Sequence, residues 1–359
     1  MPDDLDGIEA LPSSTVPEDV ALTLLDFVPE HPETQRFSAA MSEAILECGR
    51  VMDLERLDGV TVAFDFDAAL SSIDLGYESP YAKGYTKTEE FLCVGKALTV
   101  KRCGKLMSHV VFHAPTAGLL IHPEHESHLL AVNIIAHEFA HVTGLKWNDE
   151  AMPDLPLTPQ QTDWFTASLF DAALVVWDEY LACRLAAGFG DAIGQRTLYA
   201  KNYEGDASLA VFRTREPIKA YRVHADLEKM MAQIRVPMIR PLKLAGYLLG
   251  HLDGMEDKQS VDALCPRHME TPFQSMLPAL RTELRNLWDT RVHTVGAERF
   301  DSLIKQIIRI YEGVGVYPRK QGDGYYVNVP YSPETLPGNA LDQLVAPWMT
   351  PWRPSSGSG

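Results

Sequence analysis

The sequence predicts an α+β protein in which a small, mostly antiparallel sheet precedes one buried helix and a mainly helical lobe follows. Between residues 60 and 121, short runs rich in β-branched and aromatic residues alternate with glycine and proline, as strands joined by turns do. Residues 129–136 are apolar on nearly every side of a helix, so we expect that helix to be buried. Beyond residue 163 the pattern turns strongly helical.

The expected elements follow from these patterns. The runs expected to form strands begin at Thr61, Phe91, Ala97, His109 and Leu119, and a late strand is expected at residues 325–329. The buried helix should begin near Pro123, since proline suits a first turn, and end at Gly144, a favourable C-terminal cap. The later helices are expected at about 163–188, 217–235, 241–252 and 278–312.

Five segments are expected along the chain. Residues 1–35 hold nine acidic residues and no lysine or arginine, which predicts a flexible N-terminal segment, either a solvated tail or an arm that covers a site. Residues 36–146 are expected to form the sheet lobe with the buried helix. A proline-punctuated linker loop at 147–162 leads to the helical lobe at 163–330. Residues 331–359 are expected to be a proline-rich tail that ends in an added linker.

Composition excludes several classes of protein. The net charge of the 359-residue chain is −17, which repels a phosphate backbone, so we expect no nucleic-acid partner. No apolar run reaches the roughly 18 residues of a membrane span, and the acidic start does not resemble a secretory signal, so we expect a cytoplasmic protein without membrane contact. The five cysteines are scattered with no CxxC pair, which favours a reducing compartment.

The motif His137-Glu138-Phe139-Ala140-His141 is the main indication of chemistry. Residues four apart lie on the same face of a helix, so both imidazoles can reach one Zn²⁺ ion. Glu138 projects beside them, where it can act as the general base toward a water molecule. The alternative is a buried helix without metal, in which all three polar groups must find other partners. The sequence therefore predicts a zinc site with His137 and His141 as ligands.

The stretch around this motif resembles the active-site helix of the zincin metallopeptidases. The metzincin branch continues as HExxHxxGxxH, and here Gly144 matches but Trp147 stands where the third histidine would be. The gluzincin branch takes its third ligand from a glutamate on a second helix, followed three residues later by a small residue. Glu179 and Ala182 fit that pattern. The resemblance covers about fifty residues and implies that Glu179 is the third metal ligand.

Other acidic residues remain alternatives to Glu179. Asp178 is the next candidate ligand, although one residue shifts it by about 100° around the helix. Asp178 or Asp171 could instead orient a zinc-bound histidine from behind. Asp149 and Glu150 are weaker rivals beyond the expected helix end.

The resemblance also implies that a tyrosine or histidine of the helical lobe stabilises the oxyanion of the transition state. Tyr203, His224, Tyr247 and His251 are the candidates, and His251 is taken as the expected residue. It shares an apolar helix face with Leu244, Tyr247 and Leu248, where a histidine of the core is the alternative.

These observations together predict a zinc metallopeptidase, with the ion in the cleft between the sheet lobe and the helical lobe. A protein or peptide substrate would lie antiparallel to an edge strand within residues 109–121, as the resemblance implies. Two alternatives remain: a zinc hydrolase of a non-protein amide, and a regulatory or binding module that keeps the zinc site without catalysis. Substrate specificity and oligomeric state do not follow from the sequence.

Overall fold

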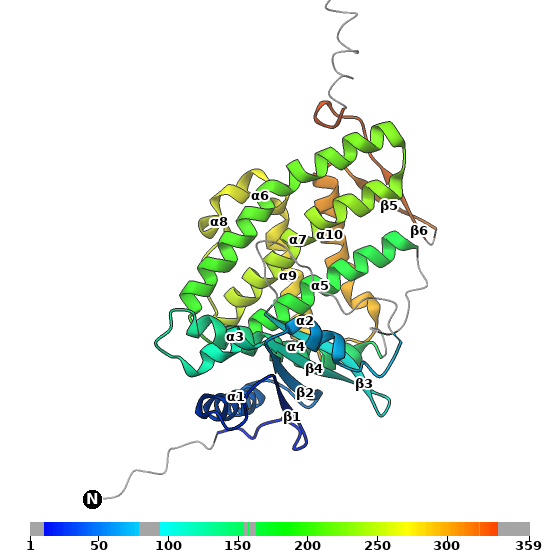
Figure 1. The fold of residues 1–359 in the computed structure, drawn as a ribbon. Coiled ribbons are helices and arrows are strands. Elements are labelled where there is room, and N and C mark those ends of the chain that lie inside the picture. Colours follow the sequence, from blue (N-terminus) through cyan, green and yellow to red (C-terminus); the bar gives the residue numbers. More distant parts are fainter. Residues whose placement is uncertain (1–10, 79–93, 154–156, 158–162, 323, 337–359) are drawn as a thin grey trace, which may run out of the picture.

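The computed structural model shows the expected α+β class, with a small sheet lobe beneath a larger helical lobe (Figure 1). It describes residues 11–78, 94–153, 157, 163–322 and 324–336. The sheet lobe contains β1 (Ala21–Leu25), α1 (Pro32–Val51), β2 (Leu57–Ala63), α2 (Phe66–Ser72), β3 (Gly95–Arg102), β4 (Lys105–His113), α3 (Ala114–Ala117), a 3-10 turn (Gly118–Ile121) and α4 (His128–Ala151). The helical lobe contains α5 (Trp164–Ala186), α6 (Ala192–His224), α7 (Leu227–Gly254), α8 (Val261–Leu264), α9 (Pro272–Thr290), α10 (Asp301–Gly313), the hairpin β5 (Tyr317–Gln321) and β6 (Gly324–Asn328), and 3-10 turns at Pro266–Glu270, Ala297–Phe300 and Pro333–Thr335.

The main sheet has the strand order β1-β2-β4-β3 and is mixed, whereas the sequence predicted a mostly antiparallel sheet. Strands β1 and β2 are parallel, β2 and β4 are parallel, and only β3 and β4 are antiparallel. The reason is connectivity. Helix α1 connects β1 to β2, and a crossover connection of this kind returns the chain in the same direction. After α2 the chain runs back along β3, and the turn from β3 to β4 makes β4 parallel to β2. The expected strand at residues 119–121 is instead part of the 3-10 turn, and the expected strand that begins at Phe91 lies partly outside the described residues.

The acidic N-terminal stretch contributes an edge strand to this sheet, so the expected flexible segment does not extend through residues 21–35. Leu22 and Leu24 alternate along β1 and pack against the core of the sheet lobe. Thr15 is tied to the end of α1, because its hydroxyl donates to the carbonyl of Met52 at 2.8 Å. Residues 1–10 lie outside the described part.

The helical lobe is organised around α5, which packs against α4 on one side and α7 on the other. The predicted helix at 163–188 and the strand at 325–329 are confirmed within two residues by α5 and β6. The predicted helix at 217–235 is wrong: α6 ends at His224, and Ala225 adopts a left-handed conformation with φ 56° before α7 starts. Prolines at 217, 237 and 241 lie inside helices rather than at their ends. No helix in the described ranges combines the length and apolar composition needed to cross a membrane.

A buried carboxylate joins three helices of this lobe. Asp253 on α7 accepts from the hydroxyl of Tyr180 on α5 at 2.7 Å, and from the Nε atoms of Arg281 and Arg285 on α9 at 2.9 Å each. Its side chain is 2% exposed. Burial by itself would raise the pKa of Asp253, but the hydrogen bonds from Arg285, Arg281 and Tyr180 outweigh burial and lower that pKa. The ionised form is therefore the one that the fold stabilises.

We expect Asp253→Asn to lower the free energy of unfolding by about 3 kcal/mol at neutral pH, since it leaves two arginines without a buried partner. A group whose pKa is lower in the folded state stabilises at pH values above its unfolded pKa, about 3.9 for aspartate, and loses this contribution as the pH falls below that value. Urea unfolding should therefore show a difference in the free energy of unfolding between wild type and variant, and this difference should become smaller from pH 7 to pH 3. Asp289→Asn, at an exposed position on α9, is the matched control and should change little. An equal difference at both pH values would contradict this account.

Candidate metal centre

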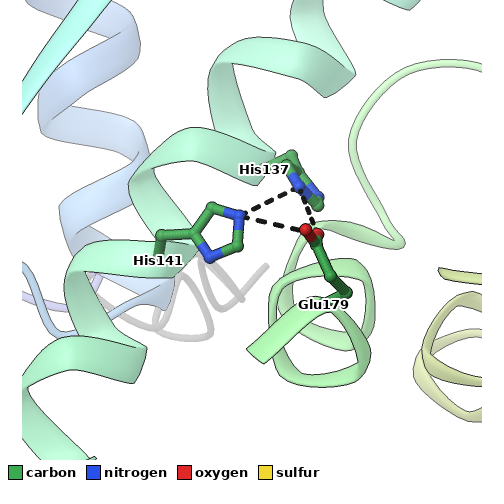
Figure 2. A group of neighbouring side chains, drawn as sticks. All are labelled: His137, His141 and Glu179. Atoms are coloured by element: carbon green, nitrogen blue, oxygen red, sulfur yellow. Dashed lines mark hydrogen bonds and ion pairs between the residues drawn. The ribbon is translucent and has the colours of Figure 1, made fainter. Parts of the chain in front are cut away.

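Helix α4 presents both histidines of the motif to Glu179 on α5 (Figure 2). The Nε2 atoms of His137 and His141 lie 3.1 Å apart. Oε2 of Glu179 lies 3.3 Å from Nε2 of His137 and 3.7 Å from Nε2 of His141. His137 and Glu179 are each only 7% exposed. The residues predicted as ligands thus converge on one point from two helices.

Gly144 explains how closely α4 and α5 approach. A Cβ atom at Gly144 would lie 3.1 Å from Oδ1 of Asp178 and 3.4 Å from Cδ2 of Leu181, so a larger residue would require these side chains of α5 to shift. On the facing helix, Ala182 is fully buried. The prediction that Gly144 ends the helix is therefore wrong, because this glycine serves packing and the helix continues for two more turns.

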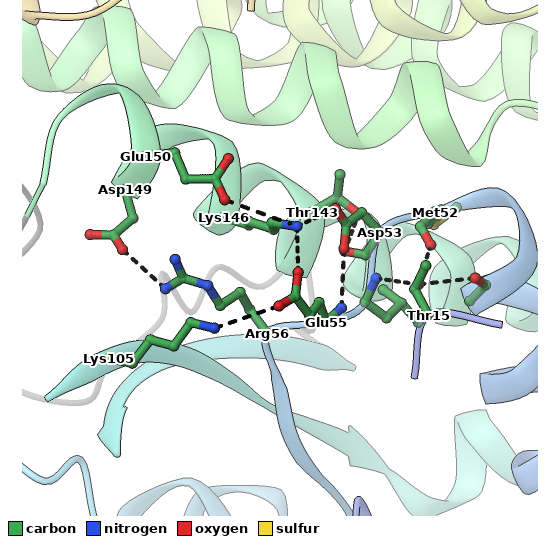
Figure 3. A network of polar contacts seen from close by, with 12 residues as sticks. Thr15, Met52, Asp53, Glu55, Arg56, Lys105, Thr143, Lys146, Asp149 and Glu150 are labelled. Carbon is green, nitrogen blue, oxygen red and sulfur yellow. Dashed lines mark hydrogen bonds and ion pairs between the residues drawn. The ribbon is translucent and has the colours of Figure 1, made fainter. Parts of the chain in front are cut away.

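Polar contacts anchor those two turns to the sheet lobe (Figure 3). Nζ of Lys146 lies 2.6 Å from carboxylate oxygens of Asp53 and of Glu55, both in the loop before β2. Arg56 of the same loop donates to Asp149 at 3.0 Å. These contacts also give Asp149 a role in the fold, away from the metal ligands. The sequence had placed Asp149 in the linker loop at 147–162, whereas α4 continues to Ala151.

Each of the two candidate histidine ligands has a neighbour on the Nδ1 side of its ring. Oδ2 of Asp178 lies 3.1 Å from Nδ1 of His141, where the sequence had suggested Asp178 as an orienting residue. Sγ of Cys183 lies 3.6 Å from Nδ1 of His137. Asp178 and Cys183 thus lie on the Nδ1 side of the two rings, and both Nε2 atoms face Glu179. Such contacts fix the orientation of a ligating imidazole.

The side chain of Glu138 contacts the sheet. Its Oε2 accepts a hydrogen bond from the backbone N–H of Ala97 on β3 at 2.9 Å. A Cβ atom at Gly95 would lie 2.7 Å from Cγ of Glu138, so β3 needs glycine there to pass this closely. The carboxylate is thus held between α4 and the edge strand β3. The expectation that residues 109–121 contain the edge strand is wrong, because β4 pairs with β2 on one side and with β3 on the other.

Helix α7 adds two residues that the sequence did not bring together. Nζ of Lys243 lies 2.8 Å from Oε1 of Glu179, so the two carboxylate oxygens have different neighbours. One turn later, the ring of Tyr247 stacks on His137 with centroids 5.3 Å apart and planes 11° apart. The sequence listed Tyr247 among four oxyanion candidates and did not consider Lys243.

The other three oxyanion candidates have other partners. Nε2 of His251 lies 2.9 Å from the carbonyl oxygen of Ala192, the contact of a histidine in the core. The hydroxyl of Tyr203 lies 3.1 Å from Nδ1 of His268. His224 accepts from the N–H of Asp226 at the end of α6. The expected role of His251 at the metal therefore has no support in the geometry, and Tyr247 is the candidate next to a ligand.

Three glycines bring α7 this close to α5. Gly246, Gly250 and Gly254 are spaced four residues apart and form one stripe along α7. A Cβ atom at Gly246 would lie 2.8 Å from the carbonyl oxygen of Val176, and one at Gly250 would overlap the carbonyl oxygen of Tyr180. This spacing is visible in the sequence and could have indicated a close helix pair.

We expect Gly250→Ala to destabilise the protein by up to about 3 kcal/mol, because the new methyl group has no room against a backbone carbonyl. The displaced α7 should also weaken metal binding, since it carries Lys243 and Tyr247. Gly205→Ala is the matched control. It also lies inside a helix, but its Cβ meets nothing within 4 Å among the described residues, so it should stabilise by about 0.5–1 kcal/mol. Thermal unfolding of both variants decides this, and equal melting temperatures would refute the packing role.

The charges of the site are strongly coupled. Burial disfavours the charged form of His141, but the nearby carboxylates, Asp178 first among them, outweigh burial and raise its pKa to about 9. For Glu179 burial is again outweighed, chiefly by Lys243, and the pKa lies well below its usual value. Burial raises the pKa of Tyr247 far above its usual range, so its hydroxyl stays protonated. Because its pKa is raised, His141 carries a proton at neutral pH that balances these carboxylates, and a bound cation would replace that proton.

The donor set fits a zinc ion. His137, His141 and Glu179 form the one group of three potential ligands detected in the described residues, with ligand atoms all within 4.8 Å of one another. Two imidazole nitrogens and one carboxylate oxygen, with a position left open, are a ligand set of catalytic zinc sites. No family model matches the chain, and neither the curated proteins nor the solved structures contain a match.

Proposed function

We propose that this protein is a zinc-dependent peptidase. The observation that carries the proposal is the convergence of His137, His141 and Glu179 on one point, with Glu138 beside them at the edge strand β3. A zinc ion held by these residues would lower the pKa of a coordinated water to about 7 and polarise a carbonyl group. The identity of the ion and the reaction are both part of the proposal.

The residues around this point have separate roles in the proposed reaction. Glu138 takes a proton from the attacking water and passes it to the leaving amine, and the Ala97 N–H keeps the carboxylate in position. Lys243 holds the second oxygen of Glu179. Tyr247 stacks on His137 and is the group in this part of the chain that could donate a hydrogen bond to the developing oxyanion.

The substrate would bind to the sheet edge. Strand β3 is the outer strand next to Glu138, and an extended peptide can add to such an edge through backbone hydrogen bonds. Because these bonds do not depend on side chains, they suit peptides of varied sequence. The strand proposed to bind the substrate is therefore β3 (Gly95–Arg102), and not a strand within residues 109–121.

The test uses a mixture of unmodified peptides of different lengths and mass spectrometry of the products. The zinc-loaded protein should cleave some of them, a chelator should stop cleavage, and added zinc should restore it. Cleavage that continues unchanged after zinc removal would contradict the proposal. So would a complete absence of cleavage by protein shown to hold zinc.

A further inference from the structure

The outer edge of β3 is divided into an open and a closed part. Ala97, Thr99 and Lys101 alternate along the strand, so their backbone groups point to the same side, away from β4. The N–H of Ala97 donates to Glu138. The carbonyl of Thr99 accepts from the hydroxyl of Tyr77 at 3.3 Å, and the N–H of Lys101 donates to the carbonyl of Leu75 at 2.7 Å. The edge is therefore covered from Thr99 onward.

Residues 74–77, here called the edge cover, are fitted to the strand. Gly76 has φ 71°, and a Cβ atom there would overlap the carbonyl oxygen of Lys101, so only glycine allows this approach. Nη2 of Arg102 donates to the carbonyl of Asp74 at 2.9 Å. Four consecutive residues thus contact the end of β3 through backbone or side chain, which makes the cover part of the folded lobe.

The open part is short. Between Ala97 and Thr99, the carbonyl of Ala97 and the N–H of Thr99 point outward, and no described residue is recorded as bonding to either. Two residues of a strand span about 7 Å. An extended peptide that starts at Glu138 and runs along β3 therefore meets the edge cover after about two residues.

We propose that the edge cover makes this protein a peptidase of amino termini, which accepts about two residues on the amino side of the bond that it cuts. The proposal rests on the proposed function. Antiparallel pairing gives the more stable ladder, and it places the amino side of the peptide toward Thr99 and the carboxyl side beyond Gly95. The edge cover then meets the amino end of the substrate.

The experiment measures binding, so that it does not depend on turnover. Peptides of one to five residues that end in a hydroxamate, a zinc-chelating group, place all their residues on the amino side. With the zinc-loaded full chain, affinity should increase up to two residues, and the third should weaken binding by about tenfold or more because it meets the edge cover. Affinity that keeps increasing through the third and fourth residues would overturn the proposal.

A variant of the edge cover makes the test specific. Tyr77→Ala removes the side chain that reaches Thr99, and the penalty for the third residue should fall below about threefold. Tyr326→Ala, an exposed tyrosine on the hairpin of the other lobe, should retain the full penalty. An unchanged penalty in Tyr77→Ala, with unchanged thermal stability, would overturn the role of the cover. Zinc-loaded protein that shows the length limit but cuts no peptide would refute the proposed function and leave the limit standing. Failure to bind any hydroxamate would overturn both.

Discussion

Glu138→Gln is expected to lower the rate of peptide hydrolysis by about 10²- to 10⁴-fold while zinc content and melting temperature stay the same. Glutamine keeps the size of the side chain, and its amide oxygen can still accept from the Ala97 N–H, which is 2.9 Å from the carboxylate in the wild type. The amide cannot take a proton from water, so only the base is lost. Initial rates on a peptide identified by the cleavage screen measure the effect.

Glu150→Gln is the matched control for this variant. Glu150 lies on the same helix, is about half exposed, and is 4.0 Å from Lys146 at the far end from the ligands. The same chemical change there should leave the rate within about twofold, as is usual for a surface substitution. Loss of activity in both variants, or in neither, would contradict the role of Glu138 as the base.

The second large effect is expected on zinc affinity. Glu179→Ala removes one of three ligands and should weaken zinc binding by more than about 100-fold, whereas Asp178→Ala removes only the group behind His141 and should cost about 10- to 100-fold. The two residues are neighbours on α5, so a comparison of the two variants distinguishes the loss of a ligand from the loss of an orienting residue. Competition with a chelator of known affinity gives both dissociation constants.

An exposed histidine supplies the control for this series. His125 lies before α4 with its Nδ1 accepting from the N–H of Ser127, and His125→Ala should bind zinc as the wild type does. Should Asp178→Ala weaken binding more than Glu179→Ala does, the third ligand would be Asp178 and the assignment of Glu179 would be wrong.

Where local periodicity decides a structure, the sequence was sufficient. The apolar residues 129–136 predicted a buried helix, and α4 contains them with Ile135 and Ala136 in the core, although Leu129 and Leu130 at its start are exposed. The four-residue spacing of His137 and His141 placed both on one face, and the structure brings Glu179 to that face as well. The histidine spacing lies within one helix, and Glu179 and Ala182 match the pattern of the gluzincin branch, so both features could be recognised in the sequence.

Where contacts between distant segments determine the structure, the predictions from the sequence were wrong. Gly144 has the residue type of a helix end, yet it lies within α4 because Asp178 and Leu181 of α5 pack against it. Likewise, β1 lies in an acidic stretch, and it forms a strand by pairing with β2. The type of a residue limits the backbone conformations that it can adopt, and the segment that packs against it determines which of them it adopts.

The second group of site residues could not be found for the same reason. Lys243 and Tyr247 reach the ligands only because the glycines of α7 let that helix lie against α5. His251 is one turn further along α7 and contacts the carbonyl of Ala192 instead. A choice between Tyr247 and His251 depends on the rotation of α7 about its axis, and periodicity within one helix does not fix that rotation.

Zinc content tests the central claim most directly. Wild-type protein, His137→Ala and His141→Ala should be loaded with zinc, dialysed and measured by elemental analysis together with the protein concentration. The account predicts about one zinc per chain in the wild type and less than about a tenth of that in each variant, because each has lost one of three ligands. Equal zinc in all three proteins, or none in the wild type, would contradict it.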